Sequence, residues 1–226
     1  MKIEMNSKIT LIAFLLGITL FSCKKENEFK DFKYADKPMA FTCEGTNSKL
    51  LNEALYSFED DITNHYSRSP QMASLSKAYS QILRVSIYGN LKPEDMVSEH
   101  TVKVFEALKK EDNLWSNNTL NYNSPALKCI SSGIVDTNIK TTLNALLSTN
   151  SMAPKLFGAA IVTNYKNALA DKNLAMYIAL DLYYSKMFGV DFSKINFDKP
   201  EQKVDFNQLP SIDKKPELDP HAGHDH

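Results

Sequence analysis

The stretch that decides the fold is DKNLAMYIALDLYYSKMF, residues 171–188. Its apolar residues recur at helical spacing on one face and also occupy much of the remaining circumference: Leu174, Ile178, Leu182, Tyr177, Leu180, Tyr184 and Met187. A helix that is apolar on most of its circumference is buried on most of it. We therefore predict that residues 171–188 form the central helix of the domain.

Asp181 is the one charged residue in the middle of this predicted helix. A buried carboxylate with a raised pKa would be a candidate functional group. An acid at such a position more often marks a narrow strip that faces solvent, and Ser185 lies one turn further along the same side. We therefore place Asp181 on an exposed strip.

The segments that precede this helix carry apolar residues at the spacing of amphipathic helices. The stripes consist of Leu51, Leu55, Phe58 and Ile62; Met72, Leu75, Tyr79 and Ile82; Val97, Thr101, Val104 and Leu108; Ile139, Leu143 and Leu146; and Leu156, Ala160 and Leu169. A short helix is expected from Pro125 to Ser131, and the asparagine-rich residues 113–124 are expected to form a loop pinned by Trp115. Seven glycines in 226 residues argue against a turn-rich β fold. The prediction is an all-α domain over residues 48–188, a compact bundle of about six to seven helices.

Two segments of this domain resemble each other. Residues 46–57 align without gaps on residues 137–148, and six of the twelve positions are identical. Each segment follows shortly after a cysteine, Cys43 or Cys129, and each begins a run of three predicted helices. Two interpretations remain open: a bundle of two three-helix halves, or a chance similarity between amphipathic helices.

The N-terminal sequence is typical of a secretory signal peptide. Lys2 and Lys8 precede Ile9–Phe21, an apolar run of 13 residues. A membrane-spanning helix needs about 20 apolar residues, so this run is too short to span a bilayer. The run ends in Leu20-Phe21-Ser22-Cys23.

This ending resembles the lipobox of bacterial lipoproteins, which has an aliphatic residue, a small residue and then an obligatory cysteine. The resemblance implies removal of residues 1–22 as a signal peptide and attachment of lipid, palmitate included, to Cys23. The lysine- and asparagine-rich composition and the charged residues 24–28 are similar to those of lipoproteins of the Bacteroidota. The body is similar to uncharacterised helical lipoproteins of Flavobacteria, a likeness that implies no activity. Residues 23–47 are expected to be the lipidated cysteine and a tether.

Cys43 and Cys129 remain once Cys23 is assigned to lipid. Outside the cytoplasm, an even number of cysteines favours a disulfide. The rival interpretation is a nucleophilic cysteine with a histidine partner. His65 and His100 lie in predicted helices far from either cysteine in sequence. We predict a Cys43–Cys129 disulfide.

Residues 189–226 are expected to form an extended, partly disordered tail, because four prolines interrupt a charged stretch. The tail ends in HAGHDH, in which His221, His224, Asp225 and His226 offer imidazole and carboxylate ligands. Such groups suit Zn²⁺ or Cu²⁺, but a tail offers loose, exchangeable binding rather than a closed tetrahedral site. The open interpretations are metal capture as a function, metal affinity without a role, and no metal binding.

The net charge of the chain and its lack of catalytic motifs argue against several classes of function. With 26 lysines and arginines against 27 acids, the chain lacks the cationic excess of a nucleic-acid binder. The sequence holds no nucleophile elbow, zinc-protease motif or phosphate loop. Glu59, Asp60 and Asp61 could supply metal ligands or an acid–base pair, but consecutive positions spread around a helix, so we assign them to a solvated face.

The sequence therefore predicts a lipid-anchored protein of the bacterial cell envelope, attached to the outer membrane on its periplasmic or surface face. We expect a non-catalytic binding or accessory protein with no cofactor. Its partners would be the membrane, reached through the lipid, and an envelope protein or ligand, with no nucleic acid. The alternative is a metal-binding or metal-delivery lipoprotein that uses the C-terminal histidines.

Overall fold

The structure, a computed structural model, describes residues 29–67 and 69–197. The helices are α2 (Ser48–Tyr66), α3 (Leu75–Ile87), α4 (Glu99–Leu108), α5 (Pro125–Gly133), α6 (Thr137–Ser148), α7 (Pro154–Thr163), α8 (Asn167–Ala170), α9 (Lys172–Tyr177), the π-helix η4 (Ile178–Tyr184) and α10 (Ser185–Met187). Short 3₁₀ turns cover Pro70–Met72, Pro93–Asp95 and Phe192–Lys194. The prediction of an all-α bundle is confirmed, with one small hairpin as the only sheet in the described part of the chain.

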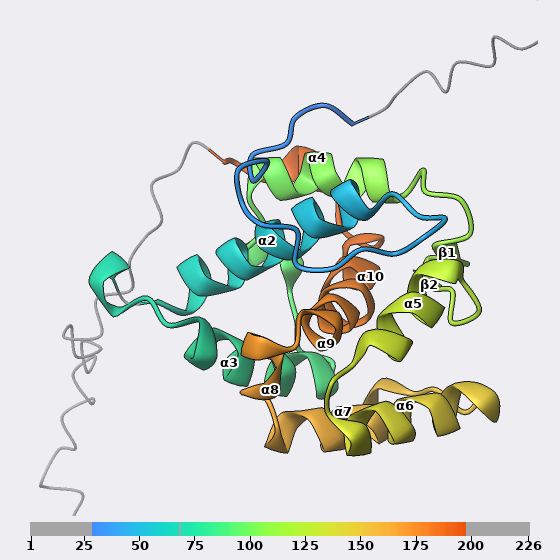
Figure 1. The fold of residues 1–226 in the computed structure, drawn as a ribbon. Coiled ribbons are helices and arrows are strands. Elements are labelled where there is room, and N and C mark those ends of the chain that lie inside the picture. The colour runs from blue at the N-terminus through green and yellow to red at the C-terminus, as the bar shows by residue number, and fades with distance from the viewer. Residues whose placement is uncertain (1–28, 68, 198–226) are drawn as a thin grey trace, which may run out of the picture. The chain divides into compact units, whose positions relative to one another are not determined.

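Three consecutive helical elements, α9, η4 and α10, follow one another without a break and form the central helix (Figure 1). Every residue from Leu174 to Tyr184 is buried. The predicted central position of residues 171–188 is therefore confirmed. The sequence did not indicate the π-helical stretch, a form in which each N–H bonds five residues back and which is frequent at functional sites.

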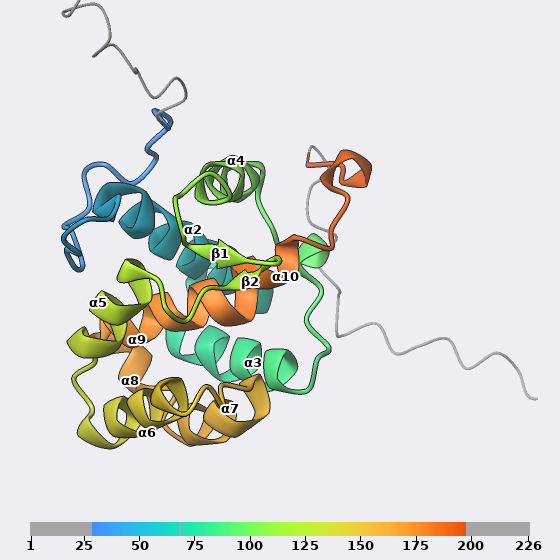
Figure 2. The same cartoon turned by 90° about the vertical axis from the view of Figure 1, so that its right-hand side faces the viewer.

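The other helices surround this central one (Figures 1 and 2). Helix α2 packs against α3 and α4, and the π-helix packs against α2 and α3. Helix α5 lies on α9, α7 lies on α3, and α6 lies on α7. Gly158 of α7 allows the close approach to α3, because a Cβ at this position would lie 2.5 Å from Cγ1 of Ile87.

The two segments that align in sequence, residues 46–57 and 137–148, have different neighbours in the fold. The first, in α2, packs against the two helices that follow it, whereas α6 has α5 and α7 as its main neighbours. Helix α2 begins at Ser48 and α6 at Thr137, which are two positions apart in the alignment. These differences in packing and start favour a chance similarity over a duplication.

Residues 29–41, here called the strap, lie against α2 rather than forming part of a tether over residues 23–47. The amide N of Ala40 donates to Oδ1 of Asn52 over 2.6 Å, and the Tyr56 hydroxyl donates to the carbonyl of Pro38 over 2.7 Å. The strap thus belongs to the same compact unit as the helices, which runs to Ile195.

The asparagine-rich loop predicted at residues 113–124 contains the hairpin β1 (Trp115–Ser116) and β2 (Thr119–Leu120). Asn117 and Asn118 at its tip have φ of 50° and 63°. Asparagine tolerates this left-handed region better than most residues, and two such residues in sequence match a type I′ hairpin turn. Trp115 pins the loop as predicted, because its indole N–H donates to the carbonyl of Leu108 over 2.8 Å.

The predicted disulfide is present: Cys43 and Cys129 are joined, with their Cα atoms 5.7 Å apart. The bond attaches the loop before α2 to the middle of α5. The predicted signal peptide (1–22), Cys23 and most of the predicted tail (189–226) lie outside the described residues. Within residues 29–67 and 69–197, no helix is long and apolar enough to cross a bilayer.

Candidate functional site

Only part of the predicted site set can be placed. Cys43 and Cys129 form the disulfide, and Cys23 and the ligand set His221, His224, Asp225 and His226 fall outside the described residues. The described residues contain no group of three or more histidines, cysteines and acids arranged to hold a metal ion. The features that remain are a cavity and a set of buried carboxylates.

The cavity has a volume of about 670 Å³ and lies where the strap, the start of α2, the end of α4 and the start of α5 meet. Its apolar lining comes from all of these elements and from the residue before β1: Phe29, Leu50, Leu51, Ala107, Leu114, Pro125 and Ala126. Four of these are buried: Leu50, Leu51, Leu114 and Ala126. Because these four are buried, they form the floor of the cavity, and the more exposed residues form its rim.

The disulfide joins two walls of this cavity. Gly45, Thr46 and Asn47 line one wall and lie two to four residues after Cys43. The opposite wall is the start of α5, one turn before Cys129. The predicted disulfide thus joins two walls of a cavity large enough for a small molecule. The sequence alone did not indicate this cavity.

A second hollow, of about 560 Å³, lies between α3 and α7 and is lined by Arg84, Ile87, Tyr88, Ala159 and Val162. Tyr88 is 76% exposed at its edge. Its lining within the described residues comes from α3, the residue that follows it, and α7.

The buried carboxylates follow a polar seam between α2 and α4. Glu53, Ser57 and Asp61 lie four residues apart on α2, so they share one face of that helix, and all three are buried. The Ser57 hydroxyl is the one buried polar side-chain atom without a hydrogen-bond partner in the described part of the chain. The other two carry carboxylates whose contacts explain their burial.

Glu53 fixes the strap. Its Oε1 accepts from the backbone N–H of Lys33 over 2.7 Å, and both of its carboxylate oxygens accept from the N–H of Tyr34. Nε2 of His100 on α4 lies 2.7 Å from the same Oε1. The ring of His100 packs against those of Phe29 and Tyr34, so the strap covers the histidine. Glu53 therefore joins the strap, α2 and α4 at one buried point.

Asp61 is the second buried carboxyl of this seam. Burial raises its pKa to about 6, although hydrogen bonds from Thr101, Ser98 and Tyr183 act in the opposite direction. The hydroxyl of Tyr183 donates to Oδ2 over 2.9 Å and the N–H of Ser98 donates to Oδ1 over 3.3 Å. A side chain from α2 is thus bonded to both α4 and the central helix.

The prediction that Glu59, Asp60 and Asp61 form a solvated face is wrong for two of the three. Glu59 is 9% exposed and accepts from Nζ of Lys172 over 2.6 Å and from the Tyr79 hydroxyl over 2.9 Å. Asp61 is 3% exposed. Only Asp60 lies at the surface, where it accepts from Lys33 of the strap over 2.9 Å.

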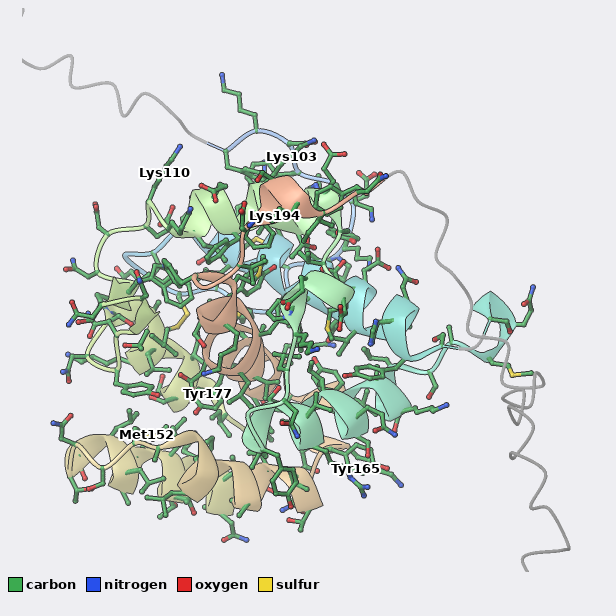
Figure 3. The ribbon with its side chains drawn as sticks, turned by 180° about the vertical axis from the view of Figure 1, so that it is seen from behind. Lys103, Lys110, Met152, Tyr165, Tyr177 and Lys194 are labelled. Carbon is green, nitrogen blue, oxygen red and sulfur yellow. A yellow bond between two sulfur atoms is a disulfide. The ribbon has the colours of Figure 1, made fainter. Side chains whose placement is uncertain are left out.

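The exposed strip predicted at Asp181 is also wrong. Asp181 is 5% exposed, and burial raises its pKa. Its two oxygens accept from the hydroxyls of Tyr122, over 2.9 Å, and Tyr177, over 2.7 Å. Because the whole π-helix is buried, its one acid is buried with it and is satisfied by tyrosines. Figure 3 labels Tyr177 on this central helix.

These carboxylates act as structural ties between elements. Each accepts two or more hydrogen bonds from different parts of the fold, as buried charges must to offset their desolvation. The spacing of residues 53, 57 and 61 was the one signal in the sequence that could have indicated the seam. The cavity, in contrast, has an apolar floor open to a ligand, so it is the candidate binding site.

Comparison with protein-family models, with curated proteins and with solved structures finds no match to this chain.

Proposed function

We propose that the protein is a lipid-anchored, non-catalytic binding or accessory protein of the bacterial cell envelope. The observation that carries the proposal is the sequence Leu20-Phe21-Ser22-Cys23 at the end of a 13-residue apolar run. The Cys43–Cys129 disulfide supports a location outside the cytoplasm, because disulfides persist in oxidising compartments. Attachment to the outer membrane follows from the likeness to lipoproteins of the Bacteroidota.

Lipid attachment is tested by expressing the full chain in a bacterial host with radiolabelled palmitate and separating a detergent phase from an aqueous phase. The wild type should take up label, lose residues 1–22 and enter the detergent phase. Cys23→Ser should abolish the label. A Cys43→Ser/Cys129→Ser double variant is the matched control, since it loses two cysteines and should keep the label. An unlabelled wild type of full length in the aqueous phase would overturn the proposal.

The binding role is supported by the cavity, whose floor is apolar and whose walls come from four parts of the chain. The test is affinity capture of the lipidated protein from envelope membranes, followed by mass spectrometry of both proteins and extracted small molecules. A variant with the cavity filled, Ala107→Phe, should lose the species that the wild type retains. Recovery of the same background from both proteins would count against a binding role.

A second candidate function, metal binding or delivery, rests on the HAGHDH ending. Three imidazoles and a carboxylate in six residues suit Zn²⁺ or Cu²⁺. Calorimetry of the mature chain with each metal ion, with and without residues 221–226, tests it. Heat of binding that disappears with the tail supports metal binding there, and equal heats from both chains exclude it.

A further inference from the structure

The body of a ligand for the larger cavity would lie on an apolar floor. The floor and sides carry Leu50, Leu51, Leu114, Ala126, Phe29 and Ala107. A volume of about 670 Å³ lies within the range of roughly 300–1,000 Å³ for small-molecule sites. The disulfide joins two of the lining elements, the loop before α2 and α5.

The uncharged polar side chains of the lining are already bonded to the protein. Nδ2 of Asn47 donates to Glu111 over 3.1 Å, and its Oδ1 accepts from the N–H of Leu50 over 3.2 Å. The Ser124 hydroxyl accepts from the N–H of Leu127 over 3.1 Å. A polar ligand would have to replace these bonds at a cost, whereas an alkyl chain leaves them intact.

The rim carries charges of both signs. Lys110 is exposed and makes no side-chain hydrogen bond or ion pair within the described residues. Its side chain projects away from the protein near the end of α4 (Figure 3). Glu111 and Asp112 follow it on the same rim. A head group that combines a phosphate with an ammonium would meet both signs, while a simple anion or cation would meet repulsion from one of them.

The cavity lies close to the proposed anchor. Phe29 lines the cavity and stands six positions after Cys23, and six residues reach at most about 20 Å. A lipid on Cys23 would therefore keep the cavity near a bilayer. We propose that the cavity binds a single-chain zwitterionic amphiphile from that bilayer, of the lysophosphatidylethanolamine class. This proposal rests on the proposed envelope-binding function and names its ligand.

The test uses the mature chain, residues 23–226, with Cys23→Ser, so that the protein is oxidised and folded but carries no lipid. Lauroyl-lysophosphatidylethanolamine is added below its micelle concentration and binding is measured by calorimetry. Fluorescence of Trp115, the only tryptophan, is a second readout because it follows Leu114 of the cavity floor. We expect saturable binding of one molecule per chain, and its absence would overturn the proposal without bearing on lipidation of Cys23.

Two matched pairs of variants locate the site. Ala107→Phe fills the cavity and should weaken binding about tenfold or more, while Ala159→Phe, in the hollow between α3 and α7, should not. Lys110→Glu should weaken binding several-fold, while Lys128→Glu, exposed on α5, should leave it unchanged. Equal affinity of wild type and Ala107→Phe would overturn the site, and circular dichroism confirms that each variant is folded.

Two further measurements test which head group the cavity prefers and whether its ligand comes from the bilayer. Laurate has the same chain with a carboxylate head, and it should bind several-fold more weakly. Laurate binding as tightly as the zwitterion would overturn the assignment of the head group. Lipidated protein in nanodiscs should still bind the amphiphile. Loss of binding there, with binding retained by Cys23→Ser, would identify the protein's own acyl chain as the occupant and overturn the bilayer as the source.

Discussion

The aligned segments 46–57 and 137–148 share six identical residues, four of them inside both helices α2 and α6, yet the two helices differ sharply in burial. Eleven of the 19 residues of α2 are buried, and two of the 12 residues of α6 are. Both helices have an apolar stripe at the spacing that predicts a helix. The comparison teaches that periodicity gives the inward face of a helix, whereas the number of neighbours decides how much of its circumference is buried.

The neighbours differ because of chain parts far away in sequence. Helix α2 is enclosed by the strap, α3, α4 and the π-helix. Helix α6 has α7 and α5 as its main neighbours and lies on the outside of the bundle (Figure 2). Its stripe of Ile139 and Leu143 is buried, and the rest of it is not.

The largest predicted effect concerns the disulfide, which joins the loop before α2 to the helix before α6. The bond closes a loop of 86 residues, and the chain-entropy argument gives a contribution of about 4–5 kcal/mol to the free energy of unfolding. The Cys43→Ser/Cys129→Ser double variant should lose about this amount in guanidinium unfolding. Wild type unfolded in the presence of a dithiol reductant is the control and should unfold at the same midpoint. A loss below about 1 kcal/mol would show that the loop before α2 is held by its hydrogen bonds instead.

The second prediction substitutes the same residue in both helices. Leu55 of α2 is fully buried and Leu146, its aligned counterpart in α6, is half-buried. Leu55→Ala should lower the free energy of unfolding by about 3 kcal/mol, because it leaves a cavity in the core. Leu146→Ala should cost about 1 kcal/mol, since neighbouring groups and water can fill the space. Urea unfolding measures both, and equal losses would contradict the difference in burial between α2 and α6.

The same distinction explains which features the sequence could predict. The central helix was predictable, because residues 174–184 show their burial in their own composition. The places of Glu59 and Asp61 were not, because their partners Lys172 and Tyr183 are 113 and 122 positions away. An acid beside its solvated neighbours and an acid bonded to a distant tyrosine look alike in a sequence.

The cavity was unpredictable for a related reason. Its walls come from the strap, α2, α4 and α5, and no segment by itself shows a hollow. The sequence predicts a tether over residues 23–47, which include the strap, because the strap has no apolar period. It is held instead by polar contacts to Glu53, Asn52 and Asp60. The disulfide was predictable because it depends on a count of cysteines and on the compartment.

The third prediction tests Asp61, one of the buried acids of α2, which have no counterpart among the two buried residues of α6. Burial raises the pKa of Asp61 from its ordinary value near 4 to about 6. Between these values the folded protein binds more protons than the unfolded chain, so stability falls as the pH rises from about 4 to about 6. The full contribution, present below pH 4 and lost above pH 6, is about 3 kcal/mol.

Asp61→Asn removes this titration and can still accept the Tyr183 hydroxyl. Chemical unfolding across pH 4–7 should show a flatter profile for the variant than for the wild type. The raised pKa of Asp181 gives the wild type a further dependence of the same sign, which Asp61→Asn should retain. An unchanged profile would mean that Asp61 is already ionised in the folded protein at pH 4.

The smallest predicted effect concerns the first turn of each helix, where α2 and α6 are alike. Oδ1 of Asn47 accepts from the N–H of Leu50 over 3.2 Å, and Oδ1 of Asp136 accepts from the N–H of Ile139 over 3.0 Å. Removing such a cap costs about 1 kcal/mol. Asn47→Ala and Asp136→Ala should therefore lower the free energy of unfolding by similar amounts. Both caps make a second hydrogen bond, to Glu111 and Asn167 respectively, so the pair stays matched.

Thermal unfolding of the two cap variants at one pH measures how much stability each variant loses, and the two losses compare the starts of α2 and α6 directly. If the caps cost the same while the two leucines do not, the helices form by the same local rules and differ only in what surrounds them. A much larger loss for Asn47→Ala would show instead that the start of α2 is a joint between elements, because Asn47 also bonds Glu111 in the turn after α4 and lines the cavity. In that case the variant should also change binding at the cavity, and Asp136→Ala should not.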